Sequence, residues 1–256
     1  MNIKPSPVKL VRSFSDVQSD MSRMDGNLTQ WENHGRTYPG STVDDSFREM
    51  ARDLDDATIN LSQLHPERLE LLGDLKRDTL DLGYNAGLTG SMYQHSTTFG
   101  SGWHDEMDPG IEDTRRAIDL LTAEPGDGAA EKEPPSPMKV MRQLSDVQAD
   151  LTRWDANFTQ WQDNGRIYPG SSVSKNVLKV AGKLYDARES MRAIHPEQAE
   201  LLEQMQGDII NVAGDAGSTR HMYSHSHTFG SGWSESLDRP IDNVRRAIDI
   251  IAESAQ

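Results

Sequence analysis

Apolar residues recur at alternating spacings of three and four along most of the chain, separated by polar and charged residues. The first series runs from Val17 to Trp31, and others run from Phe47 to Leu64, from Leu72 to Ala86 and from Ile111 to Leu121. This spacing places apolar side chains on one narrow face of a helix, whereas a strand would alternate every second residue. The pattern predicts four amphipathic helices of the kind that pack into bundles.

The same series return 130 residues further along the chain, without a gap. Trp31 corresponds to Trp161, and Trp103 corresponds to Trp233. Self-similarity at a fixed offset is the signature of a duplicated structural unit. The sequence therefore predicts an all-α protein of two tandem antiparallel four-helix bundles that arose by internal duplication. We expect the bundles at residues 8–122 and 138–256, with a linker rich in Pro, Gly and Glu at 123–137.

Several short motifs predict where the helices begin and end. Ser15–Gln18 and its counterpart Ser145–Gln148 have the form of a capping box, so we expect the first helix of each copy to start there. Gly35 and Gly165 suit a left-handed C-terminal cap. We expect prolines in the first turns of the third and fourth helices, namely Pro66, Pro109, Pro196 and Pro240. The third helix is expected to kink or end at small residues, namely Ala86 and Gly87 in the first copy and Ala216 and Gly217 in the second.

Composition narrows the class of protein. Only 35% of the residues are hydrophobic and the mean hydropathy is −0.70, so the cores must be small. No run of eighteen apolar residues is present, which predicts no membrane span. The absence of cysteine excludes disulfides and thiol chemistry. With no apolar segment typical of a signal peptide near Met1, we expect a cytoplasmic protein, and export by a system independent of signal peptides is also compatible.

The chain carries a formal net charge of −15. Residues 8–124 hold 11 Lys and Arg against 22 Asp and Glu, and residues 138–256 hold 13 against 16. The acidity therefore belongs mainly to the first copy. Such a chain is a poor partner for nucleic acid and for anionic membranes, so we expect neither.

The two copies differ from each other unevenly. Residues 42–64 match their counterparts at 5 of 23 positions, and residues 68–88 match at 6 of 21. In contrast, residues 15–41, the predicted first helix with its following loop, match at 17 of 27 positions, and residues 89–103 match at 11 of 15. Loops normally vary more than helices. The inverted order indicates a constraint on the two connecting segments beyond the packing of a core.

In an up-and-down bundle these two connections lie at the same end, and we expect them to form one surface in each copy. The candidate binding residues are Arg36, Tyr38, Tyr93, His95, Phe99, Ser101 and Trp103 in the first copy, and Arg166, Tyr168, Tyr223, His225, Phe229, Ser231 and Trp233 in the second. Tyr, Trp and Arg suit recognition, and a Gly-Ser-Gly backbone suits an anion. The alternative is that these residues plug the open end of the core.

Chemistry is weakly indicated. His221, His225 and His227 of the second copy form a weak candidate for a metal site, but the first copy has only His95 at the corresponding positions. No catalytic constellation occurs in both copies, so we expect no enzyme activity and no cofactor. The sequence favours a non-enzymatic interaction protein that binds a protein or peptide partner, with an anionic group as a possible target. The alternative function is a structural or assembly protein that self-associates through helix faces.

Overall fold

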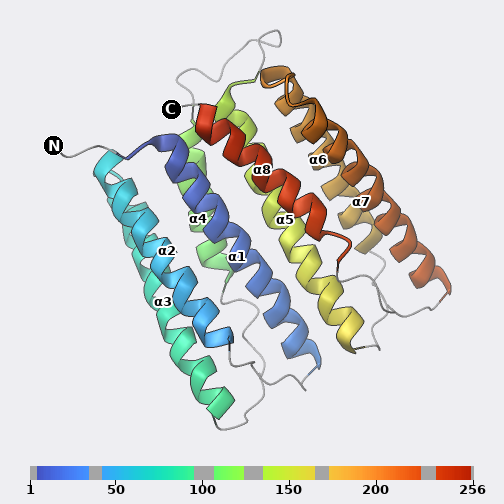
Figure 1. Cartoon of the computed structure of the whole chain (residues 1–256). Coiled ribbons are helices and arrows are strands. Elements are labelled where there is room, and N and C mark those ends of the chain that lie inside the picture. Colours follow the sequence, from blue (N-terminus) through green and yellow to red (C-terminus); the bar gives the residue numbers. More distant parts are fainter. Residues whose placement is uncertain are drawn as a thin grey trace. The chain divides into compact units, whose positions relative to one another are not determined.

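The computed structural model describes residues 5–34, 42–94, 107–123, 135–164, 173–225 and 235–254. These residues form eight helices and no strand, so the prediction of an all-α protein is confirmed (Figure 1). The helices are α1 (Pro7–His34), α2 (Val43–Leu64), α3 (Leu69–Gln94), α4 (Asp108–Thr122), α5 (Pro137–Asn164), α6 (Val173–Ile194), α7 (Ala199–His225) and α8 (Asp238–Ser254). None of the helices in the described ranges is long and apolar enough to cross a bilayer.

The chain divides into two compact units, Met1–Leu121 and Thr122–Gln256, which we call unit 1 and unit 2. In unit 1, α2 contacts both α1 and α3. The first turn of α4 lies against α1 and α3, because a Cβ atom on Gly110 would stand 2.9 Å from the sulfur of Met21 and 3.7 Å from Cβ of Asp78. In unit 2, α6 contacts α5 and α7, and α8 contacts the same two helices.

Each core contains the apolar seams that the spacing predicted, together with Phe14 and Leu144, which precede the predicted starts of the first helices. Phe14, Phe47 and Leu75 are fully buried in unit 1, as are Leu144 and Phe158 in unit 2. In unit 2 the rings of Trp154, Phe158 and Trp161 lie in mutual contact, with centroids 5.9 to 6.1 Å apart. Burial of these side chains removes apolar surface from water and holds the helices together.

The first helix of each unit begins eight residues earlier than the capping-box prediction, which was wrong. α1 starts at Pro7 and α5 at Pro137, and each proline follows a serine. The hydroxyl of Ser136 accepts a hydrogen bond from the backbone N–H of Lys139 at 3.3 Å. A serine N-cap followed by proline is a strong helix start. Ser15 and its counterpart Ser145 are instead buried inside the helices.

The third helix also differs from its prediction. Pro66 lies in a turn before α3 and not in its first turn, and His65 in that turn contacts Glu67, with Nδ1 and Oε1 3.1 Å apart. α3 does not end near Gly87 but continues to Gln94. A Cβ atom on Gly87 would meet nothing within 4 Å, so this glycine does not serve a close approach of another backbone. Pro109 and Pro240 lie in the first turns of α4 and α8, as predicted, and these helices begin at Asp108 and Asp238.

Candidate functional site

Most of the predicted binding residues lie outside the described residues. These are Arg36, Tyr38, His95, Phe99, Ser101, Trp103, Arg166, Tyr168, Phe229, Ser231 and Trp233. The backbones of Tyr93, Tyr223 and His225 lie in the last turns of α3 and α7, but their side chains are outside the described part. Gly35 and Gly165, the predicted helix caps, are outside it as well. The loop-built surface therefore stays a prediction.

The predicted metal site also lies mostly outside the described residues. His221 is exposed on α7, whereas the side chain of His225 and the whole of His227 lie outside the described residues. Within the part of the chain that the structure describes, no group of three or more His, Asp or Glu side chains is placed to hold a metal ion.

The two segments that are most alike in the two units are residues 35–41 and 89–103, which we call the similar segments. In unit 1 the start of α2 and the end of α3, which adjoin these segments, lie together. Asp44, in the first turn of α2, stands beside Gly90 near the end of α3, where an added Cβ would be 3.2 Å from Oδ2 of Asp44. Residues 35–41 lead into α2, and the second similar segment, residues 89–103, begins in the last turns of α3. In contrast, α4 begins at the level of Asp78, sixteen residues before the end of α3. Both segments therefore start from one end of unit 1.

The core contains a set of buried polar side chains that recurs in both units. The pairs with identical residues are Ser15 and Ser145, Gln18 and Gln148, Asp25 and Asp155, Asp78 and Asp208, and Thr89 and Thr219. Other core positions, apolar and polar, are exchanged between the units, for example Phe14 for Leu144 and Thr114 for Val244. Apolar exchange at similar volume is well tolerated in a core, whereas a buried polar group needs a specific partner. The five identical pairs are therefore positions at which both units bury the same polar group.

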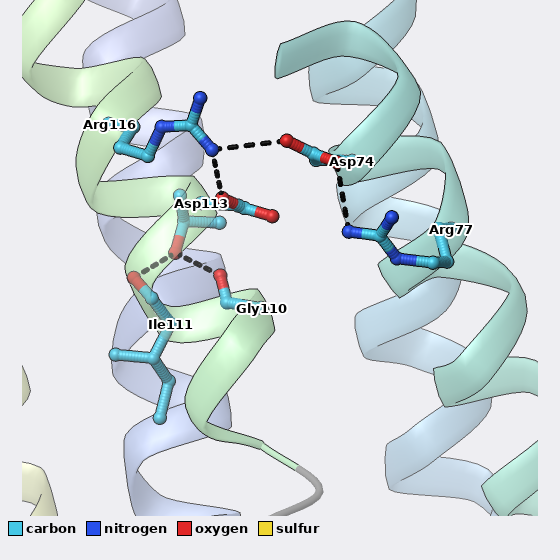
Figure 2. Close-up of polar contacts among 7 residues, drawn as sticks. Asp74, Arg77, Gly110, Ile111, Asp113 and Arg116 are labelled. Carbon is cyan, nitrogen blue, oxygen red and sulfur yellow. Dashed lines mark hydrogen bonds and ion pairs between the residues drawn. The ribbon is translucent and has the colours of Figure 1, made fainter. Parts of the chain in front are cut away.

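Asp78, one of these buried polar residues, lies in a charged cluster between α3 and α4. Arg116 of α4 donates hydrogen bonds to Asp113 at 2.7 Å and to Asp74 of α3 at 3.1 Å (Figure 2). Asp74 also accepts a hydrogen bond from Arg77 at 2.9 Å. The hydrogen bond from Arg116 holds the pKa of Asp74 below its usual value of 3.8. Asp74 is thus ionised at neutral pH and ties α4 to α3.

Asp78 is the unusual member of this cluster. The residue is only 5% exposed, and its Oδ2 atom has no hydrogen-bond partner. Burial, followed by the charge of Asp113 and a hydrogen bond with it, raises the pKa of Asp78 to about 7. Two adjacent carboxyl groups cannot both ionise cheaply, so one of them retains a proton. Arg116 binds Asp113, and Asp78 holds a proton below about pH 7.

The corresponding site of unit 2 is built differently. Asp208, the counterpart of Asp78, is fully buried and accepts two hydrogen bonds of 2.7 Å. One comes from Nε of Arg239, which stands where unit 1 has Pro109. The other comes from the side-chain amide of Asn243, which stands where unit 1 has Asp113. The guanidinium of Arg239 thus compensates the charge of the buried carboxylate in unit 2.

Beside Asp78 lies a pocket of about 220 Å³. It is lined by Met21, Asp78, Asp81, Leu82, Met107, Pro109 and Gly110. A buried carboxyl with a raised pKa at the wall of a pocket is a feature typical of functional sites. This site was not predicted from the sequence, although the sequence contains a signal for it. Asp78 is one of the few residues in 68–88 that unit 2 repeats, whereas Pro109 and Asp113 on the fourth helix are replaced in unit 2.

Comparison with known proteins adds no relative. No family model, curated protein or solved structure matches the chain. Function must therefore be argued from the residues of the two units and from the differences between them.

Proposed function

We propose that this chain is a non-enzymatic interaction protein composed of two tandem antiparallel four-helix bundles that arose by duplication. Each bundle presents a recognition surface built from the two similar segments, residues 35–41 and 89–103 in unit 1 and their counterparts in unit 2. The observation that supports it most is the inverted divergence: 11 of 15 residues are shared in 89–103, but only 5 of 23 in helix-forming 42–64. A requirement for packing alone would constrain the helices at least as strongly as the connections.

The helix contacts agree with this arrangement. In unit 1 the start of α2 and the end of α3 meet at Asp44 and Gly90, and both similar segments adjoin that end. In unit 2 the hydroxyl of Ser254, at the end of α8, lies 3.3 Å from Nε2 of His195, in the turn between α6 and α7. The last turn of the fourth helix is therefore beside the connection opposite the proposed surface, as an antiparallel bundle requires.

The acidic pair of unit 1 does not favour an enzyme. A general acid and a general base need two titratable groups at one site, and the carboxyls of Asp78 and Asp113 lie beside each other. Unit 2 has Asn243 in place of Asp113, although its segments 165–171 and 219–233 retain the same proposed surface. A function that the two units share therefore does not use this pair.

Replacing Trp103 and Trp233 together with alanine is expected to abolish partner capture while helical content is unchanged. Large aromatic side chains carry a disproportionate share of binding energy at protein interfaces. The measurement is quantitative mass spectrometry of proteins retained by the immobilised full chain and by the double variant, with circular dichroism of both. Retention of the same proteins by the double variant would contradict the proposed surface.

The matched control is Leu80→Ala with Ile210→Ala. These two residues occupy equivalent positions on α3 and α7, and their side chains are 66% and 64% exposed. They lie outside the similar segments, so this pair should leave capture unchanged. The control also tests the second candidate function, an assembly protein, because exposed apolar side chains on helix faces favour self-association. Light scattering that shows an oligomer dissociated by the Leu80 and Ile210 variant would favour assembly over recognition.

A further inference from the structure

The pocket beside Asp78 combines a buried acidic wall with an apolar one. Asp78 lines the pocket and is 95% buried, and its Oδ2 atom has no hydrogen-bond partner. Met21 of α1, Leu82 of α3 and Met107 contribute apolar side chains to the same pocket. An unpaired buried acceptor is costly unless something supplies a donor. The geometry therefore favours an occupant with an N–H group and an aliphatic portion.

The charges around the pocket leave one negative charge without a partner when all the carboxyls are ionised. On α3 the groups that face Asp78 are Arg77 and Asp81, and on α4 the group is Asp113, which Arg116 binds. Asp74, also on α3, is bound by both arginines. From α1 the pocket receives only the uncharged Met21. Asp81 is exposed and is left out of the balance. The carboxyls of Asp74, Asp78 and Asp113 then face the guanidinium groups of Arg77 and Arg116, so a proton or one further cation balances the charge.

Unit 2 shows which cation suits this position. The chain itself places the guanidinium of Arg239 on Asp208, with Nε 2.7 Å from Oδ1. Unit 1 has Pro109 at that place in its sequence, and Pro109 lines the pocket. The two units thus share the buried carboxylate, but only unit 2 provides the guanidinium for it.

We propose that the pocket of unit 1 binds a guanidinium group supplied from outside the chain, which takes the position that Arg239 occupies on Asp208 in unit 2. A planar guanidinium offers several N–H donors to one carboxylate, and its aliphatic stem lies well against Met and Leu side chains. An ammonium group is a more strongly hydrated point charge and fits such a site less well. This inference concerns the face between α3 and α4 and does not rest on the loop-built surface proposed above.

Binding of a cation is coupled to the proton on Asp78. The cation favours the ionised carboxyl, whereas the empty site favours the protonated one. Affinity should therefore rise between pH 5 and pH 8, and binding near pH 7 should release up to one proton. Isothermal titration calorimetry in two buffers with different enthalpies of ionisation measures this release.

The test is titration of the full chain with N-ethylguanidinium chloride at pH 8. For a ligand of about six non-hydrogen atoms, we expect a dissociation constant of about 1 mM. Asp78→Asn, which retains shape and removes the charge, should weaken binding at least about tenfold. Butylammonium should bind at least about fivefold more weakly than N-ethylguanidinium. Equal binding by the Asp78→Asn variant, or no saturation of the natural chain below roughly 20 mM, would overturn the proposal.

A second variant keeps the test independent of damage to the fold. Pro109→Arg with Asp113→Asn rebuilds the site of unit 2 inside unit 1, so the chain should satisfy Asp78 itself and lose affinity for N-ethylguanidinium. N-acetylarginine amide distinguishes the source of the ligand. Binding comparable to N-ethylguanidinium shows that an arginine side chain of a peptide is accepted, and selective binding of N-ethylguanidinium shows a site for free small guanidines. Undiminished binding of N-ethylguanidinium by the rebuilt double variant would contradict the assignment of the pocket.

Discussion

Arg239→Met is expected to destabilise unit 2 by about 2–4 kcal/mol. Its guanidinium is the cation that compensates Asp208, a carboxylate with no exposed surface. Methionine retains much of the aliphatic stem but leaves the buried charge with only the amide of Asn243. We place the value below that of a fully buried pair because the side chain of Arg239 is 59% exposed and water can partly replace it.

Hydrogen exchange can assign the loss of stability in Arg239→Met to unit 2. Urea unfolding of the full chain gives the change in free energy, and faster exchange in peptides from α7 and α8 locates it. Asp208→Asn should restore most of the stability when combined with Arg239→Met, because no charge is then left buried.

The control for this prediction is Lys179→Met. Lys179 is exposed on α6 of the same unit, so this variant removes the same charge without uncovering a buried partner. It should change stability by less than about 0.5 kcal/mol. A cost for Arg239→Met no larger than this would show that Asp208 does not depend on the guanidinium.

The helices themselves were predictable because their signal is local. Apolar residues spaced three and four apart identify a buried face, and those positions, such as Phe47 and Leu54, are buried. The second unit repeats the pattern with different residues, so chance periodicity is a poor explanation. The eight helices follow from this one property of the sequence.

The starts of α1 and α5 were harder to predict, because one motif has two physical uses. Ser15 and Gln18 fit a capping box, but the same spacing also places two polar side chains on one face within a helix. The competing signal was Pro7 after Ser6, repeated as Pro137 after Ser136. Burial of Ser15 and Gln18 shows that the second use applies here.

The cluster around Asp78 could be predicted only in part, since its partners come from distant helices. Arg239 and Asn243 lie four residues apart on α8, and both bind Asp208, which precedes them by more than thirty residues. Helical spacing predicts that Arg239 and Asn243 share a face. It does not predict which residue of α7 they meet, because that depends on how far α8 is displaced along α7. Only the contacts between helices supply this register.

The two units thus resolve the same problem by different chemistry. A carboxylate at position 78 or 208 lies in the core of each unit, but unit 2 compensates it with a cation that is always charged, whereas unit 1 relies on a proton. A proton responds to pH and is displaced by an external cation, so only unit 1 can be adjusted by its surroundings at this site. The difference arises from the exchanges of Pro109 for Arg239 and of Asp113 for Asn243.

Unit 1 is therefore expected to lose stability as the pH rises from about 4 to about 7, in contrast to most carboxyl effects. The pKa of Asp78 is raised to about 7 in the folded chain from an ordinary 3.8, so between these values the folded state holds more protons than the unfolded state. The free energy of unfolding then falls by at most about 1.4 kcal/mol for each pH unit and levels off above pH 7. The lowered pKa of Asp74 acts in the opposite direction but below pH 4, outside this window.

Asp78→Asn should remove this slope, because the amide imitates the protonated carboxyl at every pH. The variant is expected to match the natural chain near pH 4 and to be more stable by roughly 2–4 kcal/mol at pH 8. Urea unfolding of the full chain across this range, with hydrogen exchange in peptides from α3 and α4, measures the effect. Asp81→Asn is the matched control: it removes the same charge one turn away from an exposed position and should leave most of the slope in place. A natural chain whose α3 and α4 are equally protected at pH 5 and pH 8 would show that Asp78 is ionised throughout, and that the cluster already contains the charge it needs.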